Sequence, residues 1–214
     1  MNNLIAPHGG YKNLKSYQNA EIVFDLTVEF CNRYLTNKSN KSYRSYRTYD
    51  QMVQAARSGS RNIGEGSQTS GTSKQSELRL VDVARASLAE LLDDFQAFLR
   101  QNKLPQWDKD DRRSLVIRKL AYGTDRTHKT YVTYMADAES AANCLICLIN
   151  QTAYLLDNQI KSLGKELLAR GDLKDRLKTE KKKELFGLNE DFDGFLKKQG
   201  LRRMEDGRVA GIGE

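Results

Sequence analysis

Apolar residues recur at spacings of three and four along much of this chain, as they do on one face of an α-helix. The pattern predicts helices over about 16–35, 49–65, 73–98 and 137–169. The third stretch is the clearest, because its apolar stripe is wide enough to face more than one neighbouring helix. Long amphipathic helices with short connections are typical of a bundle, so we predict an all-α protein built as an antiparallel four-helix bundle.

Serine and glycine mark the expected ends of these helices. Ser73 is expected to cap the third helix through its hydroxyl group. Gly66 and Gly171 are expected to end the second and the last helix, because glycine adopts the left-handed conformation at low cost. The polar, basic stretch 36–51 is interpreted as a loop that leads into the second helix. The sequence shows no long alternation with β-branched residues, so no sheet is predicted.

Two segments depart from the bundle pattern. Residues 102–136 are predicted to be an insertion packed on the bundle, with a short helix over about 112–122. After Gly171 the chain becomes strongly charged, and its few apolar residues predict only a short amphipathic helix before a flexible end. We therefore expect residues 1–171 to form the bundle and residues 172–214 to form a charged tail.

The composition is that of a basic globular protein, with a formal net charge of +7 and a sequence pI of about 9.2. A basic protein attracts polyanions, of which nucleic acid is the most common in a cell. The longest apolar stretch, 141–156, contains Asn143, Asn150 and Gln151, and it is too short and too polar to span a membrane. No signal peptide is recognised at the N-terminus, so a cytoplasmic location is expected.

The segment KSYRSYRTY, which begins at Lys41, is the best candidate for binding chemistry. Arginine pairs with phosphate through two donors, and tyrosine offers a face on which an unpaired base stacks. Both residue types recur here at a spacing of three. The expected nucleic-acid-binding residues of this region are Lys38, Lys41, Tyr43, Arg44, Tyr46 and Arg47.

Two further basic sites extend this prediction. Arg57 and Arg61 lie one helical turn apart in the second helix and so present a positive stripe. In the insertion, Arg126 and Lys129 stand among several tyrosines. The alternative interpretation is that the tyrosines pack the insertion and that the charges are only solvated, as charged runs on a protein surface usually are.

Motifs of catalysis and metal binding are missing from the sequence. Cys144 and Cys147 form a CxxC pair in an apolar stretch, but a zinc site needs two more ligands at a suitable spacing. Buried cysteine more often behaves as a small hydrophobic residue. Neither a phosphate loop nor a nucleophile elbow occurs. We therefore predict a protein that is not an enzyme and that uses no metal and no cofactor.

The segment QMVQAARSGSRNIGEG, which begins at Gln51, and an Ala-Arg-small-Ser block followed by Glu in the third helix form a distinctive pair of motifs. The pair resembles the small bacterial four-helix proteins encoded in ribosomal-RNA intervening sequences. It is also similar to their relatives, the accessory variability proteins of diversity-generating retroelements. The positions that carry this likeness include Gln51, Ala55, Ala56, Ser58, Asn62, Glu65, Gly66, Arg85, Ser87 and Glu90.

The resemblance implies a four-helix bundle that assembles as a homopentamer with a basic surface. The retroelement members partner a reverse transcriptase and bind nucleic acid, so the resemblance implies the same partners here. The first hypothesis is therefore a non-enzymatic, homo-oligomeric accessory protein that binds RNA or DNA. The alternative is a protein-interaction scaffold without nucleic-acid binding, in which the insertion and the segment 188–201 are the docking elements.

The motif residues also have a structural interpretation. The small residues of the motif are expected to permit the close approach of a neighbouring helix. Asn62 and Glu65 are expected to enter a buried hydrogen-bonded network, because buried polar groups need partners. Their expected partners are Arg85 or Ser87 of the third helix.

Overall fold

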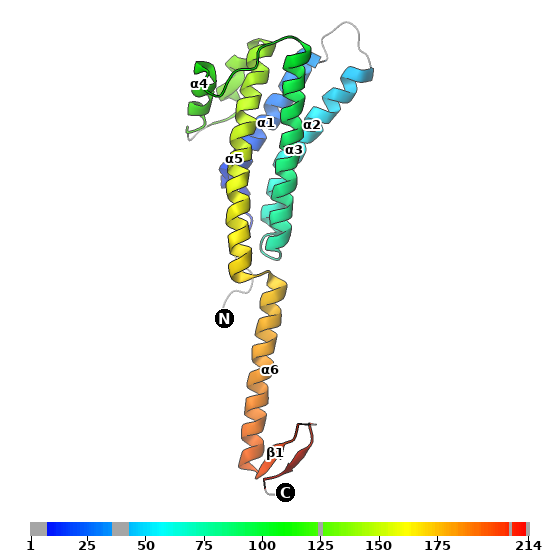
Figure 1. Ribbon diagram of the computed structural model, residues 1–214, viewed down its shortest axis with the longest axis vertical. Helices are drawn as coiled ribbons and strands as arrows, with labels where there is room; N and C mark the ends of the chain where they lie inside the picture. The colour runs from blue at the N-terminus through cyan, green and yellow to red at the C-terminus, as the bar shows by residue number, and fades with distance from the viewer. Residues whose placement is uncertain (1–7, 36–42, 124–125, 206, 213–214) are drawn as a thin grey trace.

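The protein is mostly helical, as the computed structural model shows (Figure 1). The structure describes residues 8–35, 43–123, 126–205 and 207–212. Its α-helices are α1 (Lys15–Phe30), α2 (Tyr43–Thr69), α3 (Lys74–Gln101), α4 (Arg112–Leu120), α5 (Ala138–Arg170) and α6 (Leu173–Lys198). The shorter elements are the 3₁₀ helices η1 (Tyr11–Asn13) and η3 (His128–Ala136), the π-helical turn η2 (Cys31–Leu35) and the strands β1 (Leu201–Arg203) and β2 (Val209–Gly211). The predicted all-α class is confirmed.

The core lies where α1, α2, α3 and α5 meet. Helix α1 contacts α2 and α5, and α3 contacts the same two helices from the other side. Phe30, the last residue of α1, is fully buried in this core, with its ring 4.9 Å from that of Phe95 and 4.8 Å from that of Phe98, both edge-on. Such edge-to-face pairs add to the stability that burial of the rings already provides.

Polar side chains begin two of these helices. The Ser73 hydroxyl accepts a hydrogen bond from the Ser76 amide at 3.1 Å at the start of α3, so this predicted cap is confirmed. The Asp137 carboxylate accepts one from the Ser140 amide at 2.8 Å at the start of α5. Gly171 follows the last residue of α5 with a φ of 62°, which confirms the predicted end of that helix.

The boundaries predicted for the second helix are wrong at both ends. Helix α2 begins at Tyr43, inside the stretch interpreted as a loop. Polar and charged residues are compatible with a helix that exposes one side to solvent. It also continues through Gly66. A Cβ atom at Gly66 would lie 3.3 Å from the Glu77 carbonyl oxygen and from Leu80 Cβ. The glycine therefore serves the close approach of α3 rather than a helix end.

The segment between α3 and α5 packs onto the helices through α4 and η3. Helix α4 contacts α5, and η3 contacts both α1 and α5. Trp107 anchors the irregular stretch before α4, because its backbone amide donates to Asn143 Oδ1 and its indole Nε1 donates to Glu139 Oε1, both at 2.8 Å. The Arg113 guanidinium lies 4.1 Å from the centre of the Trp107 ring.

The C-terminal segment is more regular than its sequence predicts. Helix α6 has 26 residues, and Figure 1 shows it leaving the end of the packed helices and carrying β1 and β2 at its far end. The strands pair antiparallel with Leu201 opposite Gly211, so the expectation of no sheet and of a flexible end is corrected. Three-residue strands are too short to show a period of two in the sequence.

Within the described residues, no helix combines the length and the apolar composition that a membrane crossing requires.

Candidate nucleic-acid interface

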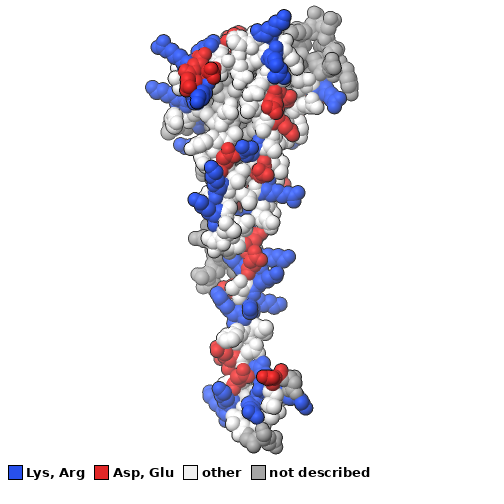
Figure 2. Space-filling view, in the orientation of Figure 1, with Lys and Arg blue, Asp and Glu red and all other residues white. Residues whose placement is uncertain are grey.

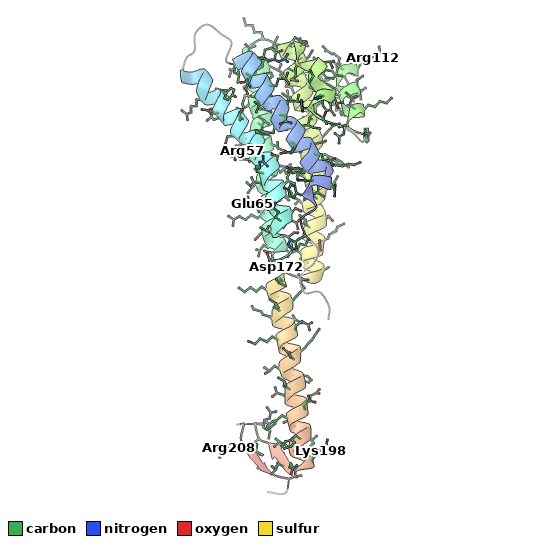
Figure 3. The ribbon with its side chains drawn as sticks, turned by 180° about the vertical axis from the view of Figure 1, so that it is seen from behind. Arg57, Glu65, Arg112, Asp172, Lys198 and Arg208 are labelled. Carbon is green, nitrogen blue, oxygen red and sulfur yellow. The ribbon has the colours of Figure 1, made fainter. Side chains whose placement is uncertain are left out.

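The outer face of α2 carries a row of exposed polar and charged residues. Arg47, Gln54, Arg57 and Arg61 recur at helical spacing on this face, and all are exposed. Figure 3 shows Arg57 and Glu65 on this helix. Arg57 and Arg61 make no ion pair with another described residue, so their charges remain available to an anion.

Most of the predicted Tyr/Arg segment lies outside the described part of the chain, either entirely or in its side chains. Lys38 and Lys41 lie outside the described residues. The backbone at residues 43–46 forms the first turns of α2, while the side chains of Tyr43, Arg44 and Tyr46 are outside the described part of the chain. Of the remaining residues, Tyr49 is half-buried and its hydroxyl donates to Asn32 Oδ1 at 3.2 Å, which ties α2 to η2.

Arg47 differs from the other arginines of the row because it lines a groove between α2 and α3. This groove, of about 750 Å³, also contains the carboxylates of Asp50, Glu90 and Asp94. Burial raises the pKa of Asp94, and the neighbouring charges of Asp93 and Glu90 raise it further. Three carboxylates against one guanidinium make the groove unfavourable for phosphate. Among the described side chains of α2, the positive charge outside this groove is therefore that of Arg57 and Arg61.

The same α2–α3 groove collects several residues of the sequence motif. Gln51, Ala55, Ser58, Ser87 and Glu90 all line it, although the two motif blocks are far apart in the sequence. Gln51 and Glu90 are exposed, and Ser58 and Ser87 are half-buried. These polar motif residues thus face a groove instead of filling the core.

The buried polar network expected around Asn62 does not form among the described residues. Glu65 is exposed, and the Arg85 guanidinium donates a hydrogen bond to Asp157 of α5 instead. The Ser87 hydroxyl donates to the Val83 carbonyl oxygen at 3.0 Å within its own helix. The prediction fails because Arg85 turns toward α5, whereas Glu65 lies on the solvent side of α2.

The small residues of α2 do lie at a close contact with α3. Ala56 is fully buried and Ala55 nearly so. A Cβ atom at Gly59 would lie only 2.7 Å from Leu88 Cδ2, so the two helices approach there more closely than a larger residue permits.

The second basic site lies after α4, with Arg126 just before η3 and Lys129 within it. Arg126 Nη1 donates to Asn19 Oδ1 at 2.6 Å and Nε donates to the Gly123 carbonyl oxygen at 3.1 Å, which fixes the guanidinium against α1. Lys129 is exposed. Tyr131 is fully buried, so for this residue the alternative interpretation, packing of the insertion, is the correct one.

The two basic sites do not form one continuous patch. Helix α1 contacts both α2 and η3, and Figure 3 shows it running between α2 and the segment 112–136. Arg57 and Arg126 are therefore on different sides of α1. A long polyanion that touches both would have to cross this helix.

The cysteines are placed for packing. Cys31 and Cys144 are fully buried, and burial raises the pKa of Cys31 to about 12 and that of Cys144 still further. Burial also raises the pKa of Cys147, against the opposing effects of Ser114 and Arg118. Thiols in this state are poor nucleophiles and poor metal ligands. Among the described residues, no cluster of histidine, cysteine and carboxylate side chains is suited to a metal ion.

Sequence reasoning missed several residues that the fold gathers around Arg126. Lys15 of α1, Arg118 of α4 and Tyr154 of α5 line one groove with it. Tyr154 belongs to the repeating pattern of α5, and nothing in that pattern distinguishes an exposed ring from a buried one. The packing of α1 and of α4 against α5 brings these side chains together.

No family model matches this chain, and neither a curated protein nor a solved structure shows significant similarity to it. Any inference about function therefore depends on the geometry of the residues described above and on the motif residues.

Proposed function

We propose that this protein is a non-enzymatic accessory protein that binds nucleic acid. The observation that carries the proposal is the pair Arg57 and Arg61, which are exposed on successive turns of α2 and have no ion-pair partner among the described residues. Guanidinium groups in this state bind phosphate through paired donors. Release of counterions from the nucleic acid then supplies most of the affinity.

The distribution of charge elsewhere supports the same proposal. The first half of α6 carries exposed lysines, including Lys174, Lys178 and the run 181–183, and Figure 2 shows basic side chains along this helix. Lys183 pairs with Glu180, so part of this charge is neutralised locally. The remaining lysines add an attraction that depends on salt but not on sequence.

The finer features of the proposal come from the motif resemblance. We propose that α1, α2, α3 and α5 form a four-helix bundle, a proposal that the contacts between these helices support. The chain then assembles in the cytoplasm as a homo-oligomer, a pentamer in the related proteins, with a reverse transcriptase as partner. Copies of a modest patch bind one polyanion far more tightly together than singly, because each bound patch raises the effective concentration of the next.

Charge reversal on α2 tests the proposal. The double variant Arg57→Glu, Arg61→Glu is compared with Arg79→Glu, Arg100→Glu, which makes the same change in charge at exposed positions of α3. Binding of single-stranded RNA, single-stranded DNA and duplex DNA is measured across a salt series. We expect the α2 variant to weaken binding to all three and to lower the slope of log K against log salt by about one per lost phosphate contact.

The control variant distinguishes a binding site on α2 from a general effect of the net charge of the protein. Equal losses in the two variants would mean that only the net charge matters and that α2 is not the interface. Absence of binding by the unchanged protein at low salt would end the proposal.

A second candidate function, a protein-interaction scaffold, is favoured by one observation. Helix α6 exposes large apolar side chains near its middle, where Leu185, Phe186 and Leu188 are each at least 60% exposed. Clustered apolar side chains in solvent are typical of surfaces that bind other proteins. The region overlaps the segment 188–201 that the sequence predicted as a docking element.

A further inference from the structure

A groove of about 680 Å³ lies between α1, α4 and α5, and Arg126 lies at it. Binding sites for small organic ligands commonly have volumes of roughly 300–1,000 Å³. Its apolar surface includes Ile146, Cys147 and Leu155 of α5. The walls come from elements that are distant in sequence, so the site exists only in the folded chain.

The groove is strongly positive. Lys15, Lys109, Arg118 and Arg126 line it, against the carboxylate of Asp108. None of these cations forms an ion pair with another described residue. Neutral acceptors hold the two arginines instead: Arg118 donates to the Lys109 carbonyl oxygen, and Arg126 donates to Asn19 Oδ1. Guanidinium groups that are fixed in this way, without a carboxylate partner among the described residues, are arranged for an anionic ligand.

Two tyrosines at the groove are exposed to an unusual degree. Tyr122 is 83% exposed and Tyr154 is 66% exposed, although both line the groove. An aromatic ring contributes little to the core when it is left in solvent. A tyrosine face beside a positive groove offers a stacking surface for a planar, uncharged group.

The groove also contains a buried acceptor without a donor. Gln151 Nε2 donates to the Arg118 carbonyl oxygen at 3.2 Å, which fixes the orientation of the amide. Gln151 Oε1 is then buried without a hydrogen-bond partner among the described residues. An unpaired buried acceptor costs free energy unless a ligand or water supplies the donor. Amide groups of this kind recognise the edges of bases.

We propose that this groove binds one unpaired nucleotide of a single-stranded nucleic acid. The base stacks on Tyr122 or Tyr154, its edge meets the Gln151 amide, and the adjoining phosphates pair with Arg118, Arg126 and the two lysines. The inference rests on the proposed nucleic-acid binding and adds a substrate class to it. A paired base is excluded because its faces are covered by its neighbours in the duplex.

The ligand class follows from the combination of groups. A phosphate alone would use the cations but leave the tyrosines and the apolar floor in contact with water. An acidic peptide would pair with the cations but has no flat ring for the exposed tyrosines. An unpaired nucleotide matches the positive, the aromatic and the amide components together.

Trp107 provides a direct report on the groove, because it lines this site and is the chain's single tryptophan. The first probe is adenosine monophosphate, compared with adenosine and with inorganic phosphate, and titrated while the Trp107 fluorescence is recorded. The second is a short single-stranded oligoribonucleotide, compared with a duplex of the same sequence.

The variants are chosen at exposed positions so that the fold is kept. Tyr122→Ala, Tyr154→Ala is compared with Leu168→Ala, a 91% exposed residue of α5 outside the groove. Lys15→Gln, Lys109→Gln is compared with Lys119→Gln, an exposed lysine of α4 that does not line it. We expect the tyrosine variant to weaken binding of the nucleotide and the oligoribonucleotide by about tenfold or more, and to leave duplex binding unchanged.

The outcomes separate this inference from the proposed function. Oligonucleotide binding that depends on Arg57 and Arg61 but not on the tyrosines would overturn the groove assignment and leave nucleic-acid binding in place. Inorganic phosphate that binds as tightly as adenosine monophosphate would also overturn it, because the base would then contribute nothing. Binding of the mononucleotide through the tyrosines, with no binding of any polymer, would overturn both the single-strand assignment of the groove and the wider proposal, because the groove would then take only free nucleotides.

Discussion

Asp172 connects two helices that are far apart in the sequence. Its carboxylate accepts a hydrogen bond from the Leu173 amide at 3.1 Å and so caps α6. The same carboxylate accepts from the Ser73 hydroxyl and from the Lys74 amide, both at 2.8 Å, at the start of α3 (Figure 3). Burial acts to raise the pKa of Asp172, but these hydrogen bonds together hold it below its ordinary value.

We expect Asp172→Ala to lower the free energy of unfolding at neutral pH by about 1–2 kcal/mol, the usual cost of losing a helix cap. A carboxyl group whose pKa is lowered in the folded state stabilises the protein above its unfolded pKa of about 3.9. That contribution is lost as the pH falls through the folded-state pKa. The difference between Asp172→Ala and the unchanged chain should therefore shrink on acidification, as measured by urea unfolding at several pH values.

Asp82→Ala, at an exposed position of α3, is the matched control. If the effect of Asp172→Ala were the same at pH 7 and at acid pH, the carboxylate charge would not be the source of the stabilisation.

At the scale of the helices, the contact between α2 and α3 depends on the absence of a side chain at Gly59. A Cβ atom at Gly59 would lie 2.7 Å from Cδ2 and 2.9 Å from Cγ of Leu88, a side chain that is fully buried and so has little room to move. Gly164 of α5 has the opposite surroundings, since a Cβ atom added there would have nothing within 4 Å of it.

We expect a glycine-to-alanine substitution to change the free energy of unfolding in opposite directions at these two positions. Gly59→Ala should destabilise the protein, because overpacking costs about 1–3 kcal/mol and exceeds the gain of up to about 1 kcal/mol in helix propensity. Gly164→Ala should stabilise the protein, because it brings the gain in helix propensity without the cost of overpacking. Thermal unfolding of the two variants checks the prediction, and a stabilised Gly59→Ala would show that the Leu88 side chain can move aside at no cost.

The molecule as a whole combines a buried core with a projecting helix. The residues that fill the core come from α1 to α5, whereas α6 keeps most of its apolar side chains in solvent. Its one buried leucine, Leu196, lies at the end that contacts β1. Arg203 of β1 bonds to Asp193 and Asn189 of α6, so the hairpin is fastened to this helix.

A chain shortened to end at Asp172 keeps the carboxylate that Ser73 and Lys74 require and removes α6 with the hairpin. We expect it to unfold cooperatively at nearly the same temperature, because the core is intact, and to keep its oligomeric state in sedimentation. Under the scaffold hypothesis, it no longer co-purifies with protein partners that the full chain binds. Capture that survives the deletion would remove α6 from that role.

Features that depend on neighbouring residues could be predicted from the order of amino acids. Apolar spacing predicts the helices, and the Ser73 cap and the Gly171 end follow from local hydrogen bonding and backbone freedom. The same local logic failed at Gly66, because a glycine that ends a helix and a glycine that admits a neighbouring helix look alike in one dimension. It also missed the strands, which are too short to show a pattern.

Which polar residues meet was settled by the folded arrangement of the helices. The pairing of Arg85 with Asp157, the acidic surroundings of Arg47 and the groove that joins Lys15, Arg118 and Tyr154 all depend on contacts between distant segments. Hydrophobic periodicity fixes which face of a helix is buried, but it does not fix the order in which helices pack or which polar residues the packing brings together. The order of the helices and the pairing of their polar residues depend on how all the side chains of the chain pack together.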